Sequence, residues 1–128
     1  MTRKPRISRP RFFNLTQVQM PVGALTSIAH RISGVLLALS IPFTIYLLKL
    51  SLQSPEGYVQ AARVLSKWEI KTLAILFIWA LTHHLLAGVR HLLSDIELGS
   101  HLGAARRSAW IVNCSGVLIT LLSVGALL

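Results

Sequence analysis

Long apolar stretches separated by short polar connections are the main feature of this sequence. Three stretches contain no Asp, Glu, Lys or Arg: residues 32–48, 72–89 and 108–128. Each is close to the about 20 residues that cross about 30 Å of hydrocarbon as an α-helix. Buried helices of a soluble protein are the alternative, but three such runs leave almost no polar surface to cover them. The pattern therefore predicts an all-α membrane protein with three transmembrane helices.

Prolines and turn residues predict where the helices begin, bend and end. Pro21 suits the first turn of a helix, and Pro42 predicts a kink within that helix. The sequence SPEG at residues 54–57 predicts a turn, and residues 58–67 are expected to form a helix at the membrane interface. The three spans are expected at about 21–50, 66–95 and 105–128.

The positive charge follows this topology. The chain has 13 Lys and Arg against 4 Asp and Glu, a net charge of +9, which in a soluble protein would suggest nucleic-acid binding. Here the basic residues gather before the first span, in an arm over residues 1–20, and around the second connection. The positive-inside rule then places the N-terminus and that connection in the cytoplasm. We expect a three-helix transmembrane domain over residues 21–128 in a bacterial inner membrane, with no nucleic-acid partner, and an arm that contacts anionic lipid or another subunit.

Cysteine content limits the possible cofactors. The single cysteine, Cys114, lies in the third span, so this chain alone cannot form a disulfide or a thiolate metal cluster. The Cys-x-x-Cys-His motif is missing from the sequence. Any haem would therefore be held without a covalent link to the chain.

The first span carries a polar stripe where a membrane disfavours one. Ser27, His30 and Arg31 share a helix face with Gly34. A charged side chain in hydrocarbon costs at least about 2.5–3.5 kcal/mol, so such residues usually serve a function. The alternative is that Arg31 reaches the lipid headgroups and has no other role.

A second stripe lies on the second span. His84, Gly88, His91 and Asp95 align on one face, and small residues border His84. Neutral imidazole is a good axial ligand of haem iron. The small residues that border His84 leave room for a flat macrocycle. His83 lies about 100° away among bulky residues, so we expect it to be structural. A histidine that only bonds a neighbouring helix is the alternative for His84.

A second axial ligand has to come from another helix. His84 and His91 share one face, so they cannot bracket a single iron from opposite sides. His30 and His101 are the other candidates within this chain, and a partner membrane subunit is the simpler source.

These residues, taken in order, resemble the cytochrome b556 subunit of succinate dehydrogenase. The resemblance rests on Arg9-Pro10, on Ser27-x-x-His30-Arg31-x-Ser33-Gly34 and on Ser54-Pro55-Glu56-Gly57. It continues with His84-x-x-x-Gly88-x-Arg90-His91-x-x-x-Asp95 and spans nearly the whole chain.

The resemblance implies a set of partners and cofactors. The chain would be one half of a heterodimeric, haem-binding helical bundle, with a second membrane-anchor subunit supplying the other ligand of haem b. An iron–sulfur subunit and a flavoprotein subunit would deliver electrons from succinate, and ubiquinone would accept them. The groups that supply these electrons would therefore lie outside this chain.

The resemblance also implies roles for individual residues. His84 would be the axial ligand of the haem iron, His30 and Arg31 would lie near the haem propionates, and Ser27 and Arg31 would bind the quinone. Asp95 would lie near the quinone pocket and help to supply protons. Three other functions stay open: the anchor of a fumarate reductase, a haem subunit of another quinone oxidoreductase, or a small transporter subunit with Arg31 and Asp95 lining its path.

Overall fold

Helices make up nearly all of the chain that the computed structural model describes, residues 19–127. Three long helices, α1 (Val22–Gln53), α3 (Trp68–Asp95) and α4 (Leu102–Leu127), are joined by turns and by the short helix α2 (Pro55–Leu65). The three long helices are long and apolar enough to cross a membrane. The prediction of an all-α, multi-pass membrane protein is confirmed. The expected basic arm lies almost wholly outside the described residues.

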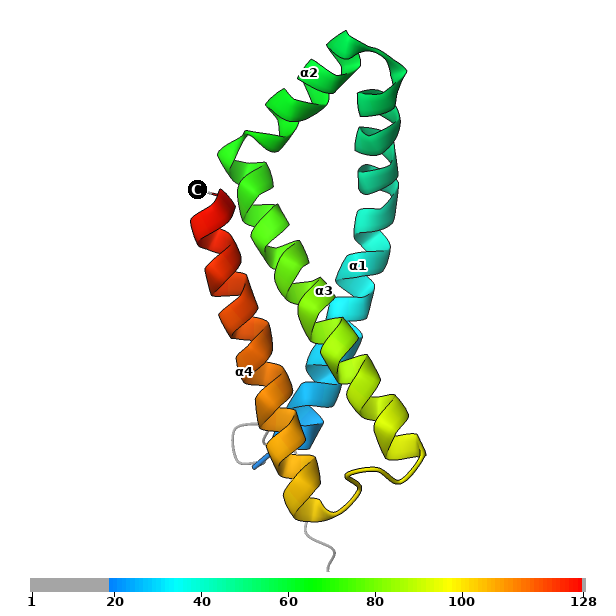
Figure 1. Cartoon of the computed structure of the whole chain (residues 1–128), viewed down its shortest axis with the longest axis vertical. Coiled ribbons are helices and arrows are strands. Elements are labelled where there is room, and N and C mark those ends of the chain that lie inside the picture. The colour runs from blue at the N-terminus through cyan, green and yellow to red at the C-terminus, as the bar shows by residue number, and fades with distance from the viewer. Residues whose placement is uncertain (1–18, 128) are drawn as a thin grey trace, which may run out of the picture.

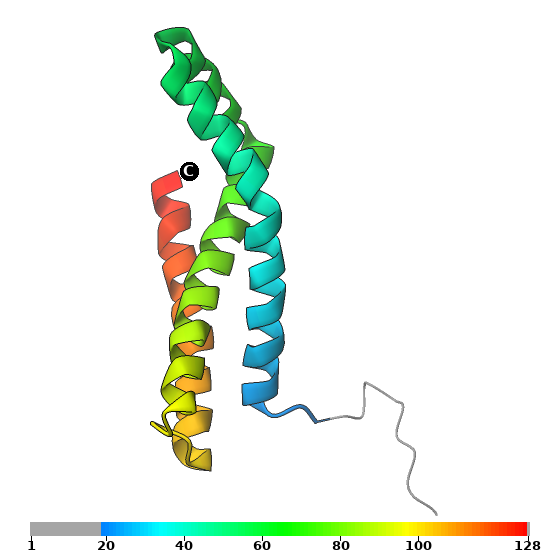
Figure 2. The same cartoon turned by 90° about the vertical axis from the view of Figure 1, so that its right-hand side faces the viewer.

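Helix α1 is continuous through a proline. It starts after Pro21, which has the extended backbone of an N-cap residue, and contains Pro42. A proline inside a helix removes one backbone hydrogen bond and usually bends the axis. Figure 2 shows the second half of α1 leaning away from the first half.

The connection from α1 to α2 is built by a cap and a glycine. The Ser54 hydroxyl accepts a hydrogen bond from the Gly57 backbone N–H at 3.0 Å, and Pro55 occupies the first turn of α2. These residues start α2 three residues before the interfacial helix that the sequence suggested. Gly57 itself is buried against the backbone carbonyl of Leu50, where a Cβ would collide with the oxygen.

The long helices do not pack closely along their whole length. Helices α1 and α3 cross near the middle of the molecule and diverge towards α2, which bridges them (Figure 1). At the end away from α2, Arg90 of α3 bonds Ser108 of α4. Ala80, Ala87 and Ala109 are completely buried. Such small residues let helix backbones approach in a membrane.

Large apolar side chains lie mainly on the outside of the helices. Leu39, Leu52 and Leu122 are each more than two-thirds exposed, as are Trp68, Leu92 and Leu102. A soluble protein does not leave so much contiguous apolar surface open to water. This outer surface suits contact with lipid or with another membrane subunit.

The close approach of Gly57 to α1 yields a prediction. Gly57→Ala should lower the apparent Tm of the detergent-purified protein, because the new methyl group has to displace the α1–α2 junction, and overpacking of this kind costs about 1–3 kcal/mol. Gly103→Ala is the matched control, since a Cβ there meets no atom within 4 Å. Equal Tm values for the two variants would show that the junction is not tightly packed.

Candidate functional site

The ring of His84 packs directly on the backbone of α1. A Cβ added to Gly34 would stand 2.9 Å from Cε1 and 3.3 Å from Nδ1 of that ring. Real Cβ atoms essentially never come so close to another heavy atom, so a side chain at position 34 would push the imidazole away. The glycine therefore allows His84 of α3 to lie against α1.

Hydrogen bonds fix the orientation of the His84 ring. Its Nδ1 lies 3.1 Å from the backbone carbonyl oxygen of His30 and 3.3 Å from Oγ of Ser33. The Ser33 hydroxyl donates to the same His30 carbonyl at 2.8 Å. Because a carbonyl can only accept, the Nδ1 of a neutral His84 carries the proton and donates it. The other nitrogen, Nε2, then keeps its lone pair, and within residues 19–127 it makes no hydrogen bond.

Two further histidines gather beside His84. The ring of His30 stacks on that of His84, with centroids 4.1 Å apart and planes at 13°. The ring of His91 lies 5.2 Å from His30 at 51°. Gly88 faces this cluster, and a Cβ there would meet Nε2 of His30 at 3.6 Å, an ordinary van der Waals contact. In the described part of the chain, no group of three or more His, Cys, Asp or Glu is placed to hold a metal ion.

Ser27 and Arg31 lie at the edge of this cluster. They are one helical turn apart on α1; Ser27 is half-buried and Arg31 is exposed. Neither side chain makes a hydrogen bond or an ion pair to another residue of the described range 19–127.

Asp95 ends α3 one turn beyond His91 and is exposed. The described residues show no hydrogen bond between its carboxyl group and the histidines. The structure thus brings His30 and His84 into contact, but it links Ser27, Arg31 and Asp95 to them only by position at the same end of α1 and α3.

The neighbouring histidine, His83, has a different environment. It is 2% exposed, its Nε2 lies 3.1 Å from Oδ1 of Asn113 on α4, and its Cβ packs on Gly116. The Thr26 hydroxyl of α1 is 3.1 Å from the same Oδ1. Asn113 therefore links all three long helices. His83 Nδ1 is buried without a partner in the described structure, and the buried ring accords with the expected structural role.

An arginine ties α3 to α4 at the same end of the molecule. Nε of Arg90 donates to Oγ of Ser108 at 3.0 Å, and Nη2 donates to the Ala105 carbonyl at 3.3 Å. These bonds hold the start of α4 beside the histidine cluster. Arg90 is half-buried, so its charge is used largely within the chain.

Sequence reasoning missed several of these contacts. No contact was assigned to Ser33, which is completely buried with its Oγ 3.3 Å from Nδ1 of His84. The face that α1 packs on its neighbours contains Thr26, His30 and Ser33, and Arg31 lies outside it. Asn113 carried a signal that could have been used, because an amide in an apolar span usually bonds another helix.

Comparisons with known proteins agree with this architecture. Residues 5–123 match the family model described as succinate dehydrogenase/fumarate reductase transmembrane subunit. A succinate dehydrogenase cytochrome b556 subunit from Coxiella burnetii is 36% identical over 106 residues, 81% of this chain and 84% of the relative. The subunit of the same name from Paracoccus denitrificans is 31% identical and covers 92% of this chain and 91% of its own.

The chain belongs to this family of succinate dehydrogenase membrane subunits. A third relative with the name succinate dehydrogenase cytochrome b556 subunit, from Rickettsia typhi, is 32% identical and covers 89% of both chains. The resemblance inferred from the residues is therefore confirmed. The family match reaches all three spans, since it includes α1, α2 and α3 completely and α4 as far as residue 123.

The link between the three helices of this succinate dehydrogenase subunit can be tested at Asn113. Asn113→Leu leaves both nitrogens of the buried His83 ring without a partner, so the apparent Tm of the purified complex should fall. Interhelical hydrogen bonds in membranes contribute about 0.6 kcal/mol on average and at most about 1.7 kcal/mol. Cys114→Ser, at the exposed neighbouring position, is the control. If both variants melt like the parent, Asn113 does not hold the helices together.

Proposed function

We propose that this chain is the haem-binding anchor of a bacterial succinate dehydrogenase and contributes to its quinone-reduction site. Its relatives bear the name cytochrome b556, and a b-type cytochrome binds haem without a covalent link. The observation that supports the proposal is the His84 ring, whose Nδ1 is bonded to the His30 carbonyl. A histidine that ligates a metal commonly donates its other N–H to a carbonyl in this way.

The residues around His84 fit a haem b. Nε2 would be the axial ligand, Gly34 and Gly88 give the cluster a border of glycines, and His30 and Arg31 would lie beside the propionates. When bound, the haem iron would supply one-electron redox chemistry. The second axial ligand would come from a partner membrane subunit. Of the nearby histidines in the described residues, His30 stacks on the ring of His84 and His91 lies on the same helix.

Quinone reduction would use the adjacent edge of α1. A quinone carbonyl accepts hydrogen bonds, and both Ser27 and Arg31 are donors. Arg31 keeps its charge at any physiological pH, so it would stabilise the negative charge that develops on the quinone oxygen. Two electrons would come from the flavoprotein through the iron–sulfur subunit, and two protons from the cytoplasm, with Asp95 near their entry. Ubiquinone is the proposed acceptor.

The orientation of the chain belongs to the same proposal. With the N-terminus in the cytoplasm of a bacterium, the histidine cluster lies in the cytoplasmic half of the inner membrane, near the iron–sulfur subunit. The family description also includes fumarate reductase, which would run the same electron path in reverse. An aerobic succinate:quinone assay against a fumarate reduction assay on the purified complex distinguishes the two directions.

Matched substitutions at the two adjacent histidines test the haem ligand. His84→Gln should abolish the low-spin haem signal in the reduced-minus-oxidised spectrum, because an amide is a poor axial ligand. His83→Gln should retain it, because glutamine can still bond Asn113. If His83→Gln loses the signal and His84→Gln keeps it, the ligand is His83 and the assignment to His84 is wrong.

Substitutions on α1 test the quinone site. Arg31→Leu should slow ubiquinone reduction more than Ser27→Ala, since a hydrogen bond to a charged group contributes about 1.5–3 kcal/mol against about 1 kcal/mol for a neutral one. Succinate oxidation with a water-soluble artificial acceptor should survive both changes. Val35→Ala, exposed one turn further along α1, is the control. Parental quinone reduction in Arg31→Leu, with normal subunit content, would move the site elsewhere.

A further inference from the structure

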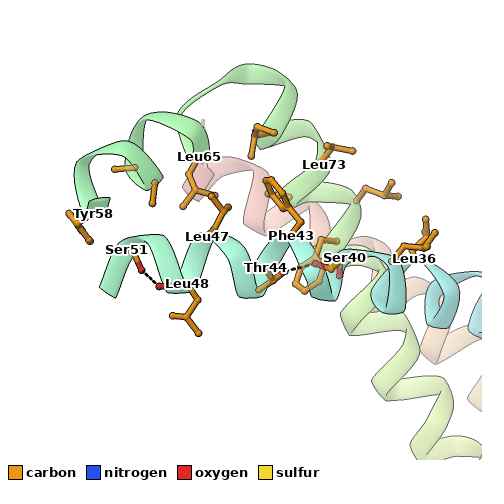
Figure 3. Close-up of a pocket in the computed structure, with 17 residues that line it drawn as sticks. Leu36, Ser40, Phe43, Thr44, Leu47, Leu48, Ser51, Tyr58, Leu65 and Leu73 are labelled. Atoms are coloured by element: carbon orange, nitrogen blue, oxygen red, sulfur yellow. Dashed lines mark hydrogen bonds between the residues drawn. The ribbon is translucent and has the colours of Figure 1, made fainter. Parts of the chain in front are cut away.

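A large apolar cavity lies in the half of the molecule away from the histidine cluster. It has a volume of about 680 Å³, is bordered by α1, α2 and α3 where these helices diverge, and is open on one side. Figure 3 shows side chains of all three helices lining it, with Leu47 of α1 and Leu65 of α2 between the ribbons. Along α1 the lining runs from Leu36 to Ser51, about 22 Å at 1.5 Å per residue. One leaflet of a bilayer is about 15 Å deep, so the cavity is long enough for an acyl chain.

The cavity walls offer almost nothing polar to a ligand. Ser40, Thr44 and Ser51 face it, but each hydroxyl donates to a backbone carbonyl of its own helix, at 2.7, 2.9 and 2.8 Å. Figure 3 shows two of these bonds as dashed lines. Each hydroxyl has one proton and has already used it, so it offers a ligand only its acceptor lone pairs. Apart from these and Tyr58, the lining is apolar and suits hydrocarbon.

Three cationic residues alternate along the chain with residues that line the cavity. Arg63 and Lys67 are exposed and Lys71 is half-buried; Arg63 follows the lining residue Ala62, and Lys71 follows the lining residue Ile70. Glu69 is the acidic residue in the same segment, so positive charge exceeds negative charge there. Within the described residues none of the three cations forms an ion pair. This arrangement complements a negatively charged headgroup above a hydrocarbon tail.

We propose that this cavity binds an anionic phospholipid, with one acyl chain between α1, α2 and α3. The phosphate of the headgroup lies at Arg63, Lys67 and Lys71. Tyr58, which also lines the cavity, and Trp68 at the start of α3 are aromatic residues of the type that gathers at the membrane surface. The lipid fills the space that the divergence of α1 and α3 opens.

Lipid binding to the purified complex with all of its subunits tests the headgroup site. After delipidation, phosphatidylglycerol and phosphatidylcholine with the same acyl chains are added, and bound lipid is counted by native mass spectrometry. The parent should retain phosphatidylglycerol over phosphatidylcholine. Arg63→Gln with Lys67→Gln and Lys71→Gln should weaken phosphatidylglycerol binding, by about fivefold for each cation removed. Arg106→Gln with Arg107→Gln, on α4, should leave it unchanged. Equal retention of the two lipids by the parent would overturn the proposal.

A second variant tests the tail site while all cations are kept. Ala62→Phe places a ring in the cavity from an exposed position on α2, so bound phosphatidylglycerol should fall. Ala104→Phe, exposed on α4, should bind it like the parent. If Ala62→Phe instead loses the second membrane subunit and keeps the lipid, a helix of that subunit occupies the groove and the proposal is wrong.

Discussion

Helices in a membrane cannot be held together by exclusion of apolar surface from water, and this constraint governs the whole structure. Lipid tails solvate leucine as well as another helix does. The helices therefore associate through close backbone approach and through hydrogen bonds that have no water to compete with them. In this chain the buried Ala80, Ala87 and Ala109 provide the close approach, and Asn113 joins α1, α3 and α4 by hydrogen bonds. The histidine cluster lies between α1 and α3, beside these contacts.

The same constraint separates the roles of two adjacent histidines. One turn of helix covers 3.6 residues, so neighbouring side chains point about 100° apart. His83 faces α4 and bonds Asn113, whereas His84 faces α1 and rests on Gly34. The buried hydrogen bond between His83 and Asn113 fixes the angle at which α3 is rotated about its own axis. That rotation then determines where the ring of the second residue lies.

The sequence was sufficient for the three spans and for the different environments of His83 and His84. Length, apolar run and helical periodicity depend on local chemistry, and each could be counted from the residues. The contacts of Ser33 and Thr26 could not be predicted, because a hydroxyl in a helix satisfies itself on its own backbone in any environment. Ser27 and Arg31 are placed on α1 as expected, but the site they would form stays open in this chain. The other residues of the proposed quinone site would belong to the subunit that packs against this edge of α1, so they cannot be predicted from this sequence.

The bond from His84 to the backbone of α1 affects how this surface can tolerate mutation. Its acceptor is the carbonyl oxygen of residue 30, an atom that every amino acid carries. Replacement of the His30 side chain would leave that oxygen in place. Substitutions of side chains on α1 can therefore leave the hydrogen bond between His84 Nδ1 and this backbone oxygen in place. Gly34 is the exception, because any side chain there would collide with the His84 ring. The position of the ring therefore depends on a residue that has no side chain.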